Sequence, residues 1–403
     1  MGCNTMKKLK LFFIFNICFL SIYAVNCEKI TISALGDIMM HKEIQESAMH
    51  QTGNYDQVFS DVKDFLLNDD LTIANLETPV ADEIRILGAP KYNAKTALIK
   101  SMKDAGIDFV SKANNHAFDQ WAFGVRKTIE ALEKNGIGYN GSGENKRVSE
   151  SFTIVNVKSF SIGIMALTFS LNGLRPTRED YYSPYINYFP PYDEAALNEV
   201  CEKIRLIKNK VDVVIILYHG GAEYQSEPSA IQTRWLKSFA ESGADVVLGT
   251  HSHVLQKVDF YKDAKENKNK LIAYSLGNFV PGLQSRYRYV KNPLEDIDNP
   301  FIKTSEGAIL KFDIVRWNGK VEIVNPRYVP LFTLVYYKTL GPEKWLTYFQ
   351  LMPIEKILQL PDFDEERFKD LKPAKNIAFL RKEKMQKLLG IPEEKISFDV
   401  IKK

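Results

Sequence analysis

Two histidines, His251 and His253, lie two residues apart in the segment Gly249-Thr250-His251-Ser252-His253. They directly follow residues 244–248, a largely apolar run that is typical of a buried strand. In an extended chain, residues two apart point to the same side, so both imidazoles are able to face one point. Neutral imidazole is a good ligand for zinc, iron and manganese. The pair therefore indicates part of a metal site, although two loop histidines with ordinary hydrogen bonds would give the same pattern.

Polar residues follow other strand-like segments in the same way. Strand-like and helix-like segments alternate along the chain, which favours a layered α/β domain. Because sites in α/β sheets form at the carboxyl ends of strands, these polar residues are expected to meet at one edge. They are Asp37 after 29–35, Asn75 and Glu77 after 71–74, Asn115 and His116 after 108–111, His219 after 211–217, and Asn278 after 270–274.

This set combines carboxylate, amide and imidazole groups and contains no thiolate. Such a mixture differs from structural zinc sites and favours a hydrolytic divalent metal. The candidates outnumber the ligands that one ion needs. Two-metal sites, with ions about 3.5–4 Å apart, activate a bridging water for attack on phosphorus or carbon. A further imidazole would be able to protonate the leaving group.

Together these motifs resemble the CapA family of poly-γ-glutamate capsule biosynthesis proteins over about residues 30–328. The resemblance implies the α/β fold of calcineurin-like metallophosphoesterases, a four-layer αββα sandwich, and one or two divalent ions such as Mn, Zn or Fe. The motifs that carry it are Gly36-Asp37-Ile38-Met39, Asn75-Leu76-Glu77, Ala113-Asn114-Asn115-His116 with Asp119, His219-Gly220-Gly221-Ala222-Glu223, Gly249-Thr250-His251-Ser252-His253 and Ser275-Leu276-Gly277-Asn278-Phe279.

The same resemblance assigns roles to the residues. His116 is expected to be the catalytic acid or to orient the substrate. Asn75, Glu223 and Asn278 are expected to support the ligands, with Glu223 orienting His219. Glu77 would alternatively cap a helix or pair with a lysine, and Asn278 would alternatively hold a turn. The expected metal ligands are Asp37, Glu77, Asn115, His219, His251 and His253.

Several positions depart from the phosphoesterase pattern. Met39 stands where the Asp-x-His motif has its histidine, and Asn75 with Glu77 replaces the second aspartate block. These changes weaken one metal position, so a single-metal or metal-poor site stays open. Two functions follow: a metal-dependent hydrolase of a phosphoester or surface polymer, or a non-catalytic component that binds a polyanion in a polymer synthesis and export complex.

The N-terminus resembles a bacterial lipoprotein signal. Three lysines precede the apolar stretch 11–24, which is short for a bilayer span, and Cys27 follows as the expected lipidation site. Secretion with cleavage after Ala24, or an uncleaved anchor, are the alternatives. We therefore expect an exported protein, membrane-anchored on the cell surface or in the periplasm. Only Cys201 lies outside this segment, so a disulfide framework is excluded.

The remaining expectations concern organisation and partners. Residues 1–27 are the predicted signal, 28–330 the CapA-like domain, and 331–403 a helical C-terminal extension. A net charge of +3 speaks against nucleic acid. The family resemblance implies an anionic polymer or phosphoester as the substrate, with a polymer synthase as a further partner. The loop 170–192 is expected to flank the site and to offer Arg175 or Arg178 to an anion. His41 is expected on the surface.

Overall fold

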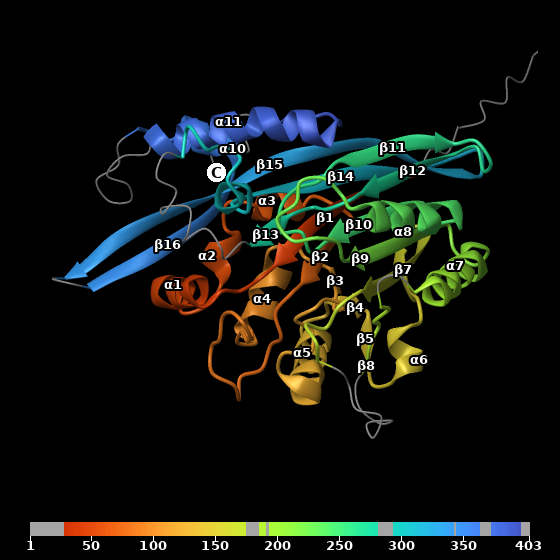
Figure 1. Ribbon diagram of the computed structural model, residues 1–403, viewed down its shortest axis with the longest axis horizontal. Coiled ribbons are helices and arrows are strands. Elements are labelled where there is room, and N and C mark those ends of the chain that lie inside the picture. The colour runs from red at the N-terminus through yellow and green to blue at the C-terminus, as the bar shows by residue number, and fades with distance from the viewer. Residues whose placement is uncertain are drawn as a thin grey trace, which may run out of the picture.

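The computed structural model describes residues 28–174, 185–190, 193–280, 293–341, 344–362 and 372–395. Two β-sheets pack face to face, and helices cover the outer side of each (Figure 1). One large cluster of apolar side chains fills the space between the sheets. Two further clusters lie between each sheet and its outer helices. The predicted four-layer αββα sandwich is confirmed.

The first sheet has the strand order β16-β15-β14-β1-β2-β3-β4, and β13 also pairs with β1. Strands β1 to β4 run parallel, whereas β14 pairs with β1 in the antiparallel sense. Along β1, Ile30, Ile32 and Ala34 face the inter-sheet core, and Leu35 and Ile38 belong to the outer cluster. The strands are β1 (Glu28–Ile38), β2 (Leu71–Leu76), β3 (Phe109–Ser111), β4 (Gly138–Asn140), β13 (Asn278–Val280), β14 (Glu306–Trp317), β15 (Lys320–Gly341) and β16 (Lys344–Pro353).

The second sheet has the order β11-β12-β10-β9-β7-β6. Its central strand β9 is buried on both faces, which explains its unbroken apolar sequence. The strands are β6 (Thr153–Val157), β7 (Phe160–Thr168), β9 (Val213–His219), β10 (Val246–Thr250), β11 (Val258–Asp263) and β12 (Lys268–Ala273); a separate small ladder joins β5 (Ser142–Gly143) to β8 (Tyr185–Ile186).

Helices bury one apolar face against each sheet. The N-caps of α7 and α8 are Asp193 and Ser229, whose side chains accept hydrogen bonds from the first turn of each helix. On the first sheet lie α1 (Lys42–Thr52), α2 (Asp56–Phe59), α3 (Lys63–Leu66), α4 (Ala97–Asp104) and α5 (Trp121–Lys134); on the second lie α7 (Glu194–Lys208) and α8 (Ala230–Glu241), and the short α6 (Lys146–Ser149) and α9 (Pro300–Lys303) join loops.

The predicted helical extension from residue 331 is wrong in its first part. Strand β15 runs through this position, and β16 pairs back along it. The reason is long-range, because residues 306–311 of β14 offer a hydrogen-bonding edge to residues 327–332. Helices begin only with α10 (Ile354–Gln359) and α11 (Lys372–Leu389), whose apolar side chains join the inter-sheet cluster beside β15.

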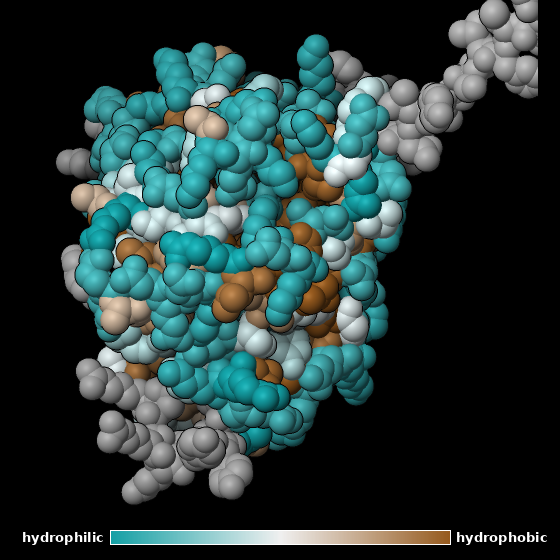
Figure 2. Space-filling model, turned by 90° about the vertical axis from the view of Figure 1, so that its right-hand side faces the viewer, coloured by the Kyte–Doolittle hydropathy of each residue, from teal (hydrophilic) through white to brown (hydrophobic). Residues whose placement is uncertain are grey.

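Hydrophilic side chains cover most of the end of the molecule seen in Figure 2, and hydrophobic ones gather in a strip across its middle. None of the helices within the described ranges is both long and apolar enough to cross a bilayer.

Candidate metal centre

Buried carboxylates and imidazoles from four strand ends meet where the two sheets face each other. Oxygen and nitrogen atoms of Glu77, His219 and His251 lie within 4.8 Å of one another, and so do those of Asp37, Glu77 and His253. Glu77 belongs to both groups. The first sheet thus supplies the carboxylates and the second sheet supplies the imidazoles.

The register of the parallel strands explains this meeting. Asp37 on β1 lies beside Asn75 on β2 and beside Asn278 on β13. On the second sheet, His219 on β9 lies beside Thr250 on β10. Each polar residue follows several apolar ones, so burial of the strand brings the polar end to the edge of the core.

Two glycines permit the close approach of the strands behind the cluster. A Cβ atom on Gly249 would lie 2.0 Å from the carbonyl oxygen of Tyr274. A Cβ atom on Gly36 would lie 2.0 Å from the carbonyl oxygen of Gly277. Any other residue at either position would push apart the strands that carry Asp37 and the histidine pair.

The extended-strand explanation for the histidine pair is wrong. Strand β10 ends at Thr250, and His251 and His253 have φ angles of 95° and 58°, in the left-handed region. Residues other than glycine rarely adopt this conformation, and it concentrates at functional sites. The turn still directs both rings inward: His251 Nδ1 lies 3.1 Å from His219 Nε2, and His253 Nδ1 lies 3.3 Å from Asp37 Oδ2.

Asp37 is fully buried between polar partners. Its Oδ1 accepts a hydrogen bond of 2.7 Å from Asn75 Nδ2, and its Oδ2 accepts one of 3.3 Å from the backbone N–H of His251. Burial raises the pKa of Asp37, but the hydrogen bond with His253 and the charge of His219 outweigh burial and hold this pKa below its usual value. Asp37 is therefore a carboxylate at neutral pH.

The pKa values of His251 and His253 are shifted in opposite directions. Burial, together with the charges of His219 and His253, holds the pKa of His251 well below its usual value. Burial also lowers the pKa of His253, but the carboxylates of Glu77 and Asp37 outweigh it and raise this pKa to about 9. His251 therefore offers a neutral imidazole, and His253 holds a proton that a cation would displace.

Glu77 provides the test of whether this cluster fits a metal ion. Its side chain is fully buried, and neither carboxylate oxygen has a hydrogen-bond partner among the residues that the structure describes. His219 Nε2 lies 3.4 Å from Oε1, but the geometry does not make a hydrogen bond. A buried carboxylate without compensation costs several kcal/mol. A divalent cation would supply the compensation, and the nitrogen and oxygen donors suit Mn, Zn or Fe.

Asn115 and His116 lie at the end of β3, on the outer side of this cluster. Asn115 Oδ1 lies 2.9 Å from His219 Nε2, so its amide oxygen faces the cluster. His116 Nδ1 lies 2.8 Å from Asp119 Oδ2. Burial lowers the pKa of His116, but the hydrogen bond with Asp119 and the charge of Glu77 outweigh it and raise this pKa. His116 stays outside the two ligand groups and is buried, with 9% of its surface exposed.

Asn75 and Asn278 take supporting positions. Asn75 Nδ2 lies 3.1 Å from His219 Nδ1, in addition to its bond to Asp37. Asn278 Oδ1 lies 3.1 Å from His253 Nδ1, and its Nδ2 donates to the carbonyl oxygen of Thr304. Each asparagine therefore restricts the orientation of an imidazole.

Glu223 does not lie beside His219, contrary to its predicted role. Among the described residues, the polar partners of His219 are Asn75, Thr250 and Asp37 at Nδ1 and Asn115, His251 and Glu77 at Nε2. Glu223 is exposed, and its charge contributes to the raised pKa of His253.

The loop 170–192 is described only in part. Asn172 Oδ1 accepts a hydrogen bond from Asn115 Nδ2, and the ring of Phe169, just before the loop, lies 5.0 Å from that of His251. The start of the loop therefore flanks the cluster. Arg175, Arg178 and the predicted lipidation site Cys27 lie outside the described residues.

His41 is buried rather than on the surface, which contradicts the prediction. Its Nε2 lies 2.9 Å from the hydroxyl of Tyr92, and the Tyr92 ring packs edge-on against His116 at 4.7 Å.

The sequence analysis did not identify three residues at the site: Tyr92, Thr250 and Lys112. Burial lowers the pKa of Lys112 to about 7, and its Nζ donates to the carbonyl oxygen of Leu76. Thr250 and Lys112 stand in or next to strand-end motifs in the sequence, but no such signal marks Tyr92.

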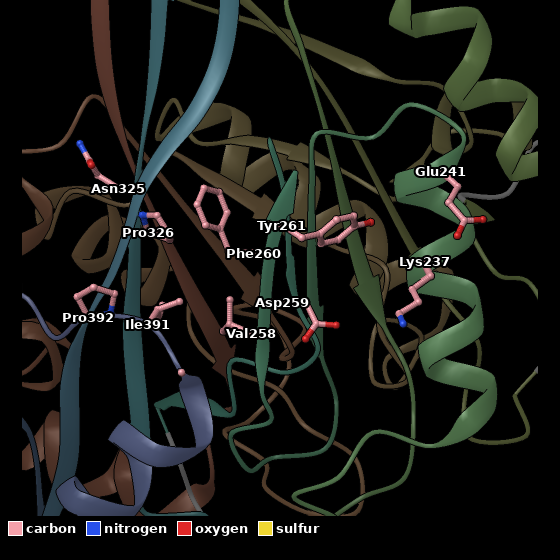
Figure 3. A pocket seen from close by; sticks show the side chains of 11 residues that line it. Lys237, Glu241, Val258, Asp259, Phe260, Tyr261, Asn325, Pro326, Ile391 and Pro392 are labelled. Atoms are coloured by element: carbon pink, nitrogen blue, oxygen red, sulfur yellow. The ribbon is translucent and has the colours of Figure 1, made fainter. Parts of the chain in front are cut away.

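A groove of about 870 Å³ lies elsewhere, beside the edge strand β11 (Figure 3). Phe260 and Tyr261 from this strand, Pro326 from β15 and Lys237 from α8 line it. None of the predicted site residues is among its lining residues, so the groove is separate from the metal centre.

The profile described as "Bacterial capsule synthesis protein PGA_cap" matches residues 31–282. The chain belongs to this family. The matched range contains all the predicted ligands and Asn278, whereas β14, β15, β16 and α11 lie beyond it.

Two relatives carry names from the same process. The capsule biosynthesis protein CapA of Bacillus anthracis is 33% identical over 298 residues, covering 72% of this chain and 65% of the relative. The PGA biosynthesis protein CapA of Bacillus subtilis (strain 168) is 28% identical over 267 residues, or 62% of each chain. The chain therefore spans less than two thirds of the length of these relatives.

A solved structure, the Thermus thermophilus sulfate thiohydrolase SoxB in complex with glycerol, has a TM-score of 0.40 at 10% identity over 88% of this chain and 61% of that chain. That similarity is too low to bear on function.

Proposed function

We propose that this protein is a metal-dependent hydrolase that acts on a phosphoester or on an anionic polymer of the cell surface. The observation that carries the proposal is Glu77, a fully buried carboxylate without a hydrogen-bond partner that belongs to both ligand groups. A bound divalent ion would polarise the reacting group and lower the pKa of a water molecule.

Different residues of the chain would bind the metal ion and donate the proton. Asp37, Glu77, His219, His251 and His253 would hold the cation, and Asn115 directs its amide oxygen toward the same space. His116 would hold a proton for the leaving group. Asp119 keeps the His116 ring in place from the Nδ1 side and supports its charged form, which leaves Nε2 for the substrate.

The substrate class rests on the relatives. Their names refer to capsule and PGA biosynthesis, so we propose an anionic surface polymer before a small phosphoester. A non-catalytic role in binding such a polymer is favoured by one observation: Met39 occupies the expected position of a histidine ligand, and its sulfur lies 3.3 Å from His41 Nε2.

Metal analysis and a substrate screen of the purified full chain test this proposal. We expect bound transition metal and turnover of phosphoesters or γ-glutamyl peptides with added Mn²⁺ or Zn²⁺. His251→Ala should lose both, and His50→Ala, an exposed histidine on α1, should lose neither. Absence of metal in the wild type, with no effect of His251→Ala, would leave the binding role.

We also propose that the protein is anchored to a membrane through lipid on Cys27, because basic, apolar and cysteine residues follow one another there. A fatty-acid probe should label the wild type and Cys201→Ser, but not Cys27→Ser. Persistent labelling of Cys27→Ser would exclude this cysteine as the anchor.

A further inference from the structure

Trp121, the first residue of α5, is an exposed aromatic side chain in an unfavourable backbone conformation. Its side chain is 54% exposed, and its φ angle is 55°. A bulky residue in the left-handed region is a conformational outlier that a glycine would avoid. An exposed indole gains little from burial in the fold. Among the described residues, the contacts recorded for its ring are the edge-on ring of Phe118, at 5.9 Å, and the ammonium group of Lys91. Neither packing nor backbone geometry explains a tryptophan here.

A lysine covers the ring of Trp121. Lys91 Nζ lies 5.0 Å from the centroid of the indole, a cation–π distance. No carboxylate pairs with Lys91 among the residues that the structure describes. By contrast Lys127, which lies over the neighbouring Phe123, is neutralised by Glu130 and Glu83. Lys91 therefore leaves a positive charge available beside a flat apolar surface.

The segments that carry this pair are linked to His116 by hydrogen bonds and a ring contact. Tyr92, next to Lys91, donates its backbone N–H to Asp119 Oδ2, and its carbonyl oxygen accepts a hydrogen bond of 2.9 Å from Gln120 Nε2. The Tyr92 ring packs against His116, and Asp119 holds the same imidazole. The segment that carries Lys91 and the one that carries Trp121 therefore both connect directly to His116.

We propose that Trp121 and Lys91 form a binding subsite for an anionic polymer chain that extends outward from His116. The ammonium group of Lys91 would bind an anionic group of the chain, and the indole face would pack against the apolar spacer between anions. This inference rests on the proposed function, since it names where the polymer lies beyond the reacting unit. Carboxylate and phosphate polymers share this chemistry.

A membrane surface is the other class of partner that exposed aromatics and lysines would suit. Lys91 and Trp121 are linked to His116 through Tyr92 and Asp119. This link favours the polymer, because a surface used only for docking to lipid would not need to adjoin the site. Vesicle binding is therefore one outcome of the test.

The test measures equilibrium binding of fluorescent poly-γ-glutamate, and separately of polyphosphate, to the full chain carrying His116→Asn, so that binding does not depend on turnover. Trp121→Gly should weaken affinity for one of these polymers about tenfold, the size expected for loss of a cation–π and stacking contact. Lys91→Gln should weaken it severalfold and flatten its salt dependence. Trp317→Ala, a matched exposed tryptophan in the β14–β15 turn, should not change affinity.

Trp121→Gly also tests whether the tryptophan is structural. Glycine suits the left-handed backbone, so melting temperature and metal content should be retained. A lowered melting temperature with unchanged polymer affinity would overturn the subsite. So would polymer affinity equal to wild type, or loss of binding only to phosphatidylglycerol vesicles. If binding depends on Trp121 but the wild type turns over no substrate, the hydrolase proposal fails and the subsite stands.

Discussion

Glu77 and Glu306 are both fully buried glutamates, and their surroundings are opposite. Glu306 at the start of β14 accepts two hydrogen bonds of 2.7 Å from Arg381 on α11, a bidentate pair. Asp298 accepts a third bond from the same guanidinium. Glu77 accepts none. Because both side chains are fully buried, the two carboxylates differ in their hydrogen-bond partners and not in their exposure to solvent.

This difference separates a structural charge from a functional one. A buried ion pair offsets its desolvation only when its geometry is good and its lone pairs are satisfied, as at Glu306. Glu77 has nearby positive groups, Lys112 and the histidines, but no hydrogen bond from any of them. The fold therefore links α11 to β14 through Glu306, whereas the surroundings of Glu77 are compatible with a bound cation.

The largest effect should come from breaking the structural pair. Arg381→Met leaves Glu306 buried and unpaired, and should lower the free energy of unfolding by about 3–5 kcal/mol in urea titrations. The double variant Arg381→Met with Glu306→Met removes both charges and should recover much of this loss. A single variant as stable as the wild type would mean that the pair does not hold α11 to the sheet.

Removing the charge of Glu77 should not lower the stability of the metal-free protein, in contrast to Arg381→Met, but it should strongly reduce metal binding and activity. Glu77→Gln should reduce metal affinity and any turnover by at least about 100-fold, since even supporting residues at metal sites cost 10–100-fold. Without metal, the variant should be at least as stable as the wild type, because a buried charge is removed.

Glu83→Gln, an exposed glutamate in the following loop, is the matched control for Glu77→Gln and should change neither quantity. Chelator should lower the melting temperature of the wild type but not that of Glu77→Gln. A metal-free Glu77→Gln protein that is strongly destabilised would show that Glu77 is structural, like Glu306.

The smallest expected effect concerns Asp119, a buried carboxylate whose partner is itself titratable. The pKa of His116 is raised above its unfolded value, so its interaction stabilises the fold below about pH 6.5 and is lost as pH rises through the folded pKa. Asp119→Asn should move the upper limb of the pH–rate profile about one unit lower. Asp64→Asn, an exposed aspartate of α3, should leave the profile unchanged.

An unchanged upper limb in Asp119→Asn would show that His116 is not the group whose deprotonation ends activity. Asp119 would then be a structural carboxylate, like Glu306.

Local patterns were enough to predict most of the sandwich. The apolar runs 211–217 and 244–248 predicted strands, and they form most of β9 and β10. Patterns failed at 331–353, where the strands of the β15–β16 hairpin depend on the edge offered by β14. In this segment, pairing with a strand that is distant in sequence decides whether the chain forms a strand or a helix.

The sequence by itself determined which polar residues stand at strand ends, because a strand's apolar run and the residue that follows it are neighbours in the chain. It thereby placed Asp37, Glu77, His219 and the pair of His251 and His253 near one edge. Only the tertiary structure decided how they face one another. The histidine pair meets the carboxylates through a left-handed turn, and the contact between His251 and Asp37 joins residues 214 positions apart. Arg381 reaches Glu306 across 75 positions, while no donor reaches Glu77. Charge compensation depends on which distant side chains the packed sheets bring within bonding distance, and no local pattern records that.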